Sequence, residues 1–242
     1  MDVVDLKQFY ASPLGQVSRR MIAHRILAHV EPARGLTVLG VGYATPYLGA
    51  WREKADRVLA FMPGWQGVAR WPDDAANTAA LADETELPLP DSSVDLAIVV
   101  HALELTEHRR LMLRELWRVL TPEGRCVFVV PNRRGMWARV DATPFGHGRP
   151  FSRPQLTQIL KDAMFTPGGW ANALYMPPVK RRFIMGSAPA WERMGLASGA
   201  GFSGVIIADA QKQVFAAVRG KPQKRLVPVL DPSRVQRTKP IS

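Results

Sequence analysis

Residues 94–131 read VDLAIVVHALELTEHRRLMLRELWRVLTPEGRCVFVVP and decide the fold class. Two short apolar, largely β-branched runs, 94–100 and 126–130, predict buried strands. Between them, apolar residues recur at helical spacing over 112–120 and predict an amphipathic helix that Thr106 caps. A buried strand, a helix and a second buried strand are typical of a parallel sheet covered by helices.

The same alternation continues toward the N-terminus. Ser12 followed by proline predicts the start of a helix over residues 13–30. Residues 36–41 and 57–62 are further short apolar runs and predict buried strands, with a weaker helix over 46–55 between them. Two more strand-and-helix units therefore precede the deciding stretch.

Toward the C-terminus the pattern changes. Ser152 and Gln155 form a capping-box pattern that opens another helix. Residues 205–208 and 214–218 predict two late strands joined as a hairpin, which argues for an antiparallel edge. We therefore predict an α/β fold: a doubly wound, mostly parallel sheet that helices cover on both faces, with an antiparallel edge strand.

The length and charge of the chain limit how it can be organised. Its 242 residues, 47% of them hydrophobic, suit one domain with a sizeable core. The net charge is +11, and residues 219–242 contain seven basic residues but one acid. We expect one domain over 1–218, with a substrate-side insertion at about 133–200, and a flexible basic tail over 219–242. A mildly basic body argues against nucleic acid as the main ligand.

Several classes are excluded by composition. No apolar run approaches the roughly 20 residues that a membrane-spanning helix needs, so we expect no transmembrane segment. The N-terminal residues contain acids and no apolar core, which is unlike a signal peptide. Cys126 is the single cysteine, which excludes an internal disulfide and a multi-cysteine zinc site. We expect a protein of the reducing cytoplasm without a bound metal.

Four segments resemble class I S-adenosylmethionine-dependent methyltransferases of the small-molecule type that acts in ubiquinone and menaquinone synthesis. They are TVLGVGYATPYL (37–48), DETELPLPDSSVD (83–95), ELWRVLTPEG (115–124) and the late strands within 205–218. The second and third segments are specific in combination, whereas the first is weak by itself. The resemblance covers roughly residues 10–218 and implies the Rossmann-like fold of that family.

The resemblance implies S-adenosylmethionine as the cofactor, bound off the carboxyl ends of the strands. Asp83 matches the acid that accepts a hydrogen bond from the adenine amino group, although a solvated loop acid is the simpler interpretation. The positions that match cofactor contacts are Gly40, Gly42, Tyr43, Thr45, Met62, Asp83, Glu84 and His101.

The sequence does not single out a catalytic residue. His101 follows a strand end and could act as a base, or it could be a structural histidine. Tyr10 precedes the first helix and would gate the methyl group, or simply pack that helix. His147 and Arg149 lie in a glycine-rich loop, which makes them, with Tyr10, candidates for the substrate side. His101, Tyr10 and His147 are thus the catalytic candidates.

The first motif departs from the family pattern. Gly40 stands at the place of an acid, while Ala44 and Pro46 stand at the places of later glycines. Residues 60–63 provide no carboxylate for the ribose hydroxyls. The protein could bind the cofactor through other groups, or it could be non-catalytic and bind a protein partner; an error of register in one segment is the third explanation.

The expected activity is methyl transfer from S-adenosylmethionine to a small-molecule or lipid-like acceptor. A degenerate, non-catalytic protein that binds a partner or regulates is the chief alternative. RNA methylation is a weaker one, because the strand ending at residue 100 leads into His101 rather than into an Asn- or Asp-Pro-Pro-aromatic motif. Cys126, expected inside a buried strand, is a poor nucleophile for cytosine methylation.

Overall fold

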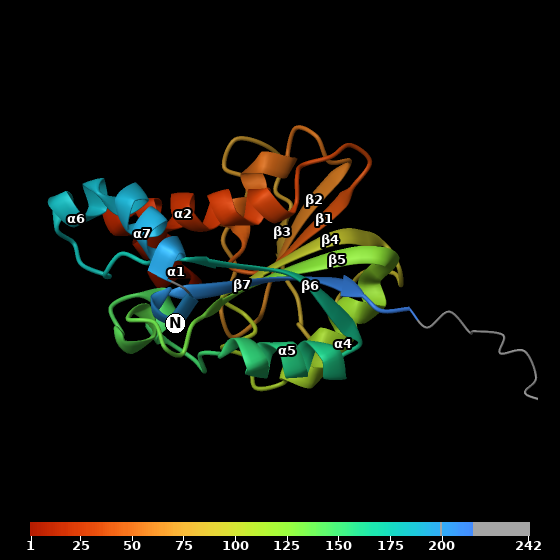
Figure 1. Cartoon of the computed structure of the whole chain (residues 1–242). Helices are drawn as coiled ribbons and strands as arrows, with labels where there is room; N and C mark the ends of the chain where they lie inside the picture. The colour runs from red at the N-terminus through yellow and green to blue at the C-terminus, as the bar shows by residue number, and fades with distance from the viewer. Residues whose placement is uncertain (199, 215–242) are drawn as a thin grey trace, which may run out of the picture.

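Seven strands form one sheet in the computed structural model, which describes residues 1–198 and 200–214 (Figure 1). Their order in the sheet is β3-β2-β1-β4-β5-β7-β6. The strands are β1 (Thr37–Gly42), β2 (Arg57–Met62), β3 (Ala79–Leu81), β4 (Val94–Val100), β5 (Leu120–Pro131), β6 (Phe165–Ala173) and β7 (Val205–Lys212). Strands β1 to β5 pair in parallel, whereas β7 is antiparallel to both β5 and β6. The predicted fold class is confirmed.

Helices cover both faces of this sheet, with α2 and α7 on one face and α4 and α5 on the other (Figure 1). The α-helices are α1 (Val3–Ala11), α2 (Pro13–His29), α3 (Thr45–Leu48), α4 (Arg109–Val119), α5 (Arg153–Asp162), α6 (Arg182–Gly186) and α7 (Ala188–Ser198). Short 3₁₀ turns are η1 (Gly49–Trp51), η2 (Trp137–Arg139), η3 (Pro144–Gly146) and η4 (Ala200–Phe202). No helix within the described ranges is long and apolar enough to cross a membrane.

Alternating residues of the central strands pack into two separate hydrophobic cores. Ile98 of β4 packs in the core that contains the apolar residues of α2, whereas its neighbour Val99 packs in the core with those of α4 and α5. Successive side chains of a strand point to opposite faces, so a continuous apolar run is needed where both faces are buried. This explains why the strand signals of 94–100 and 126–130 were so strong.

The predicted late hairpin is wrong. Strand β7 continues without a break from Val205 to Lys212, and its antiparallel neighbour β6 precedes it in the chain. The sequence of β6, FTPGGWANA, contains a proline and two glycines, which disfavour strands, and only the pairing with β7 holds it extended. Residues 215–218 of the expected second strand, and the tail over 219–242, lie outside the described residues.

Three local predictions also change. Helix α4 begins at Arg109 without a side-chain cap, and the hydroxyl of Thr106 accepts a hydrogen bond from the backbone N–H of His108 instead. The helix expected over 46–55 is reduced to the single turn α3 and the 3₁₀ turn η1. Helix α1 was not predicted at all, although Asp2 caps it. The caps at Ser12 and Ser152 are confirmed.

The carboxyl ends of the parallel strands meet at one edge of the sheet. From β1 the chain adds β2 and β3 on one side, whereas β4 and β5 lie on the other side of β1. The order therefore reverses between β1 and β4, and loops on the two sides leave the sheet in different directions. Ligands of open α/β sheets bind outside the carboxyl ends at such a switch point.

Candidate cofactor and active site

The loop after β1 is packed against the protein itself. Gly42 has a φ of +75°, and a Cβ there would lie 2.3 Å from the carbonyl oxygen of Val100. A Cβ on Gly40 would lie 2.7 Å from a methyl group of Leu48. Tyr43 continues the loop, and its N–H donates to the Val100 carbonyl at 2.9 Å. Both glycines are thus required by close contact between β1, α3 and β4.

The end of β2 is apolar. Met62 is fully buried, and no carboxylate occupies residues 60–63. The turn that follows places Gln66 in the interior, where its side-chain N–H donates to the carbonyl oxygen of His101 at 2.8 Å. The position at which the family pattern has a ribose-binding acid therefore holds a core side chain.

A hollow of about 560 Å³ lies off the ends of β2 and β3. Gly64 and Trp65 form one side of it, residues 81–85 form another, and His108 and Leu111 at the start of α4 complete it. Its wall combines one indole, two leucines and two carboxylates. Two of the predicted cofactor positions, Asp83 and Glu84, therefore border the same hollow.

The two acids differ in environment. Asp83 is exposed, and one of its oxygens accepts hydrogen bonds from the N–H and hydroxyl of Thr85 at 2.8 and 2.6 Å. These bonds lower the pKa of Asp83, so it is ionised at neutral pH. Glu84 is buried and accepts from the indole of Trp65 at 3.0 Å and from the hydroxyl of Thr106 at 2.8 Å. Glu84 fixes the indole, whereas Asp83 keeps an oxygen toward solvent.

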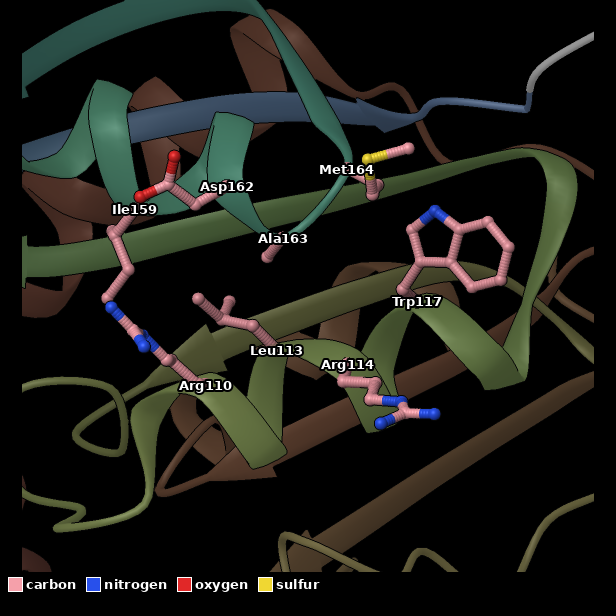
Figure 2. Close-up of a pocket in the computed structure, with 8 residues that line it drawn as sticks. All are labelled: Arg110, Leu113, Arg114, Trp117, Ile159, Asp162, Ala163 and Met164. Carbon is pink, nitrogen blue, oxygen red and sulfur yellow. The ribbon is translucent and has the colours of Figure 1, made fainter.

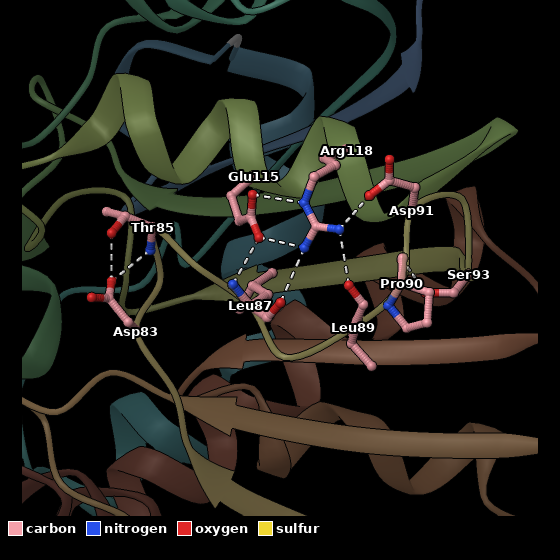
Figure 3. Close-up of polar contacts among 9 residues, drawn as sticks. All are labelled: Asp83, Thr85, Leu87, Leu89, Pro90, Asp91, Ser93, Glu115 and Arg118. Atoms are coloured by element: carbon pink, nitrogen blue, oxygen red, sulfur yellow. Dashed lines mark hydrogen bonds and ion pairs between the residues drawn. The ribbon is translucent and has the colours of Figure 1, made fainter.

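Arg118 of α4 holds the loop that continues from this hollow (Figure 3). Its guanidinium donates to the carbonyl oxygens of Leu87 at 3.0 Å and Leu89 at 2.9 Å. The same group pairs with Glu115 at 2.6 Å and with Asp91 at 2.5 Å. Because Glu115 also accepts from the N–H of Leu87 at 2.8 Å, the two segments that carried the family resemblance are bound directly to each other.

A buried polar cluster lies at the end of β4. The hydroxyl of Tyr10 is 2.8 Å from Nε2 of His101 and 2.9 Å from the hydroxyl of Tyr47. Nδ1 of His101 is 3.4 Å from Oε1 of Glu104, and both side chains are 1% exposed. His101 has a φ of +51°, which is rare for a residue with a side chain. Tyr10 and His101 are thus brought together from α1 and β4.

Unpaired polar atoms distinguish this cluster. Among the described residues, both carboxylate oxygens of Glu104, Nδ1 of His101 and the side-chain oxygen of Gln66 are buried without a hydrogen-bond partner. Buried polar groups in proteins are usually paired. These buried polar atoms therefore call for a functional explanation or a ligand that pairs with them.

Aromatic rings fill the space around the cluster. The ring of Tyr43 stacks on Tyr10 at 5.6 Å, and Tyr47 packs edge-on against it at 6.0 Å. Burial, followed by the neighbouring Tyr47, raises the pKa of Tyr10 well above its ordinary value. Burial likewise raises the pKa of Tyr43 to about 12, against a hydrogen bond from Thr45 that lowers it. The phenols are therefore neutral at physiological pH.

The glycine-rich loop reaches the cluster through Phe145. Its ring lies 5.0 Å from that of His101, whereas His147 points its Nε2 at the carbonyl of Asp141, at 2.8 Å. The N–H of Arg149 donates to the carbonyl of Glu104 at 2.8 Å. The loop is thus at the site, but an aromatic residue that the sequence did not single out makes the contact.

Several residues at the site were missed or underrated from sequence. Glu104 was visible only as an acid three residues after His101, and Tyr47 only as part of the departing first motif. No sequence pattern marked Trp65 as a site residue, because the hollow that it borders exists only after folding. Cys126 is buried in β5, and burial raises the pKa of its thiol, which agrees with an inert cysteine.

A second hollow, of about 640 Å³, lies between α4 and α5. Figure 2 shows Leu113, Ile159 and Ala163 lining it, with the guanidinium groups of Arg110 and Arg114 at its margin. The described residues of its wall come from α4, from α5 and from the turn before β6, and not from the carboxyl end of a strand. It therefore lies on a helical face and is distinct from the site at the switch point.

Comparison with known proteins places the chain in a class. Residues 25–128 match the family model described as a methyltransferase domain. The chain also has the fold of an S-adenosylmethionine-dependent methyltransferase from Thermotoga maritima, with a TM-score of 0.62 and 14% identity over 87% of this chain and 96% of that one. Residues 25–128 are thus similar to a methyltransferase domain, and the described chain has the Rossmann-like fold of class I S-adenosylmethionine-dependent methyltransferases, a family whose cofactor is S-adenosylmethionine.

Two curated relatives share a printed activity. Malonyl-[acyl-carrier protein] O-methyltransferase of Halorhodospira halophila is 34% identical over 141 residues, which is 51% of this chain and 47% of that protein. The enzyme of the same name from Serratia marcescens is 32% identical over 113 residues, or 46% of this chain and 44% of that protein. The chain thus spans less than half the length of each of these relatives.

Proposed function

We propose that the protein transfers a methyl group from S-adenosylmethionine to a small-molecule or lipid-like acceptor. The observation that carries this proposal is the hollow of about 560 Å³ off the ends of β2 and β3, bordered by Trp65 and Asp83. In this proposal the hollow accepts the adenine, to which it offers a flat aromatic side chain and an ionised acceptor. An adenine ring has a flat face and an amino donor that suit both.

The charge of the interior supports a cationic ligand. Besides its own carboxylate the cofactor bears two positive charges, on its ammonium and sulfonium groups, and the buried carboxylate of Glu104 lies at the neighbouring strand end beside His101. A buried carboxylate favours a cation that can pair with it. When bound, the cofactor supplies an already activated methyl group, so the protein has only to align the reactants and exclude water.

The proposal gives each of the site residues a role. Asp83 and Glu84 line the part of the site that binds the adenine. The loops around the rest of the cofactor contain Gly40, Gly42, Tyr43, Thr45 and Met62. His101 and Tyr10 lie beside the transferred methyl group, and Phe145 leads to His147 and Arg149 on the acceptor side. The activity of the two curated relatives supports a lipid-like acceptor, and the aromatic surroundings of His101 suit an apolar one.

One observation favours a second candidate function, that of a non-catalytic binding protein. Met62 is fully buried where a ribose-binding acid would stand, and the aromatic rings of Tyr10 and Tyr43 fill the space beside β1. Loss of a charged acceptor weakens binding by roughly ten- to a hundredfold. A chain that had lost the cofactor would keep the fold and bind a protein partner instead.

Calorimetric titration with S-adenosylmethionine and S-adenosylhomocysteine separates the two. Methyl transfer predicts micromolar binding of both, weakened about tenfold by Asp83→Ala. Asp74→Ala is the matched control, because Asp74 is an exposed acid paired with Arg52 away from the hollow. Absence of binding up to millimolar concentration would support the non-catalytic alternative, and equal affinity of both variants would remove Asp83 from the site.

A further inference from the structure

The buried carboxylate of Glu104 is costly to the fold. Its side chain is 1% exposed, and neither oxygen has a hydrogen-bond partner among the residues that the structure describes. The group it faces is Nδ1 of His101, at 3.4 Å, which is also without a hydrogen bond. A buried carboxylate that is poorly paired destabilises a protein unless it serves a function.

The contacts continue from His101 in one direction. Nε2 of His101 lies 2.8 Å from the hydroxyl of Tyr10, whose second partner is the hydroxyl of Tyr47 at 2.9 Å. A carboxylate, an imidazole and a hydroxyl thus follow one another in the order that lets an oriented imidazole take a proton from a hydroxyl. Gln66 fixes the histidine backbone through its hydrogen bond to the His101 carbonyl.

We propose that Glu104, His101 and Tyr10 form a proton relay that deprotonates the methyl acceptor, and that the acceptor is therefore a hydroxyl or amine compound and not a carboxylate. This inference rests on the proposed methyl transfer. An ionised carboxylate needs no base, and it would approach the negative charge of Glu104. A hydroxyl or an ammonium-derived amine must lose a proton as it is methylated.

The step balances in atoms and charge. The acceptor oxygen or nitrogen bonds to the methyl carbon, and the carbon–sulfur bond breaks with its electron pair left on sulfur. The acceptor proton passes to the Tyr10 oxygen while the proton of Tyr10 passes to Nε2 of His101. The resulting imidazolium lies beside the carboxylate of Glu104, which stabilises it. Tyr10 is the catalytic residue, and His101 and Glu104 are positioning residues.

The environment of Tyr10 agrees with a concerted transfer. Burial raises the pKa of Tyr10, so a free phenolate is disfavoured, and the hydroxyl must pass its own proton on as it receives another. Tyr47 occupies the second hydrogen-bonding position of the Tyr10 hydroxyl with a phenol. A phenolic or alcoholic acceptor would replace Tyr47 at this position and present the same kind of group.

Other ionisable groups face the relay from the elements around it. Arg109 of α4 acts on Glu104 electrostatically, and Arg19 of α2 acts on Tyr47. Tyr43 and Tyr47 face Tyr10 from the chain after β1. All four remain in place in the variants used below, so a difference between variants reports the substituted residue.

A proton magnetic resonance experiment tests the relay without an acceptor. A hydrogen bond between Nδ1–H of His101 and Glu104 would give a far-downfield exchangeable proton signal in the wild-type protein. The signal should be lost in Glu104→Gln and in His101→Asn. Glu192→Gln is the matched control, because Glu192 is also buried with one unpartnered oxygen but bonds the N–H of Tyr175 far along the chain. Absence of the signal from folded wild type between pH 5 and 9 (about two units either side of neutrality) would overturn the relay.

Transfer of a radiolabelled methyl group tests the acceptor class. The probes are catechol, a hydroxyquinone, a primary amine and a malonyl thioester. Label should reach hydroxyl or amine probes, and Glu104→Gln should lower kcat by on the order of a hundredfold with little change in KM. The deficit should shrink as pH rises, because hydroxide replaces the lost base, whereas Glu192→Gln should follow the wild-type profile. Rescue of the rate in Glu104→Asp would further support a carboxylate requirement.

The outcomes separate the relay from methyl transfer itself. Calorimetric binding of S-adenosylhomocysteine combined with labelling of the malonyl thioester alone would overturn the acceptor class, and so would labelling of none of the probes. A wild-type pH profile in Glu104→Gln would overturn the relay. Failure of the wild type to bind S-adenosylhomocysteine would instead overturn the proposed methyl transfer.

Discussion

The two sides of the sheet's carboxyl edge are held in different ways. On the side of β1 and β2, apolar contact dominates: Gly40 faces Leu48, and Met62 is fully buried. On the side of β4 and α4, polar bonds dominate, with Arg118 joining Glu115 to the backbone of the preceding loop. We call these the packed side (residues 40–66) and the bonded side (residues 83–118).

The difference explains which motif could be recognised. On the bonded side Arg118 and Glu115 have specific partners in the loop over residues 87–91, so the spacing of the acids and prolines there follows from geometry (Figure 3). On the packed side, shape and volume are the requirement, and different residues can meet it. The segments 83–95 and 115–124 therefore match the family pattern, whereas the first motif departs from it although the backbone still forms the same strand and turn.

The largest effect should come from filling the packed side. Gly42→Ala places a Cβ 2.3 Å from the Val100 carbonyl at a φ of +75°, so the backbone of β1 or β4 has to move. We expect the free energy of unfolding to fall by about 3 kcal/mol or more, measured by urea denaturation. Gly64→Ala, with open space around the new Cβ, should change it by less than about 0.5 kcal/mol. Equal losses of unfolding free energy in the two variants would mean that the structure accommodates a Cβ at residue 42 without strain.

Removing the central cation should break the bonded side. Arg118→Ala leaves two backbone carbonyls without this donor, and leaves the buried carboxylate of Glu115 with the N–H of Leu87 in place of a charged partner. Because Arg118 is 32% exposed, water compensates in part, and we expect a loss of about 2–3 kcal/mol in urea denaturation. Arg52→Ala, which removes an exposed pair with Asp74, should cost less than about 1 kcal/mol. A similar loss of stability in Arg118→Ala and Arg52→Ala would contradict the conclusion that burial makes the contacts of Arg118 more stabilising than an exposed ion pair.

Loss of the hydroxyl donor that orients an exposed carboxylate should affect binding alone. Thr85→Val removes the hydroxyl that orients Asp83 at 2.6 Å without touching the Arg118 contacts. We expect affinity for S-adenosylhomocysteine to fall about threefold, or roughly 0.7 kcal/mol, with an unfolding midpoint close to wild type. A large change in the unfolding midpoint would show that this loop contributes mainly to the stability of the fold and less to cofactor binding.

The smallest effect concerns Glu192, a buried carboxylate for which the described part of the chain provides no salt bridge. Burial raises the pKa of Glu192, so its ionised form is disfavoured in the native state. An acid whose folded pKa is raised contributes stability at low pH that is lost as pH rises through that pKa. Glu192→Gln should therefore flatten the decline in stability above about pH 4.5 and gain a few tenths of a kcal/mol at pH 7. Chemical denaturation at pH 4 to 8 (roughly spanning the carboxyl range) measures it, and a steeper decline would contradict the sign.

The sequence by itself determined the central parallel strands and the bonded side. Apolar runs at 94–100 and 126–130 can only be buried on both faces, and their alternation with helices admits few arrangements. The capping residues Ser12 and Ser152 also act locally, through hydrogen bonds within a few residues. Local chemistry of this kind is legible without knowledge of the fold.

Only the tertiary structure decided what depends on distant partners. Strand β6 forms against its own propensity because β7 pairs with it, and α1 brings Tyr10 to His101 across 91 positions of sequence. The unpaired state of Glu104 is likewise a property of everything packed around it. Propensity and motif spacing report neighbours along the chain, whereas burial and the pairing of polar groups are set by neighbours in space.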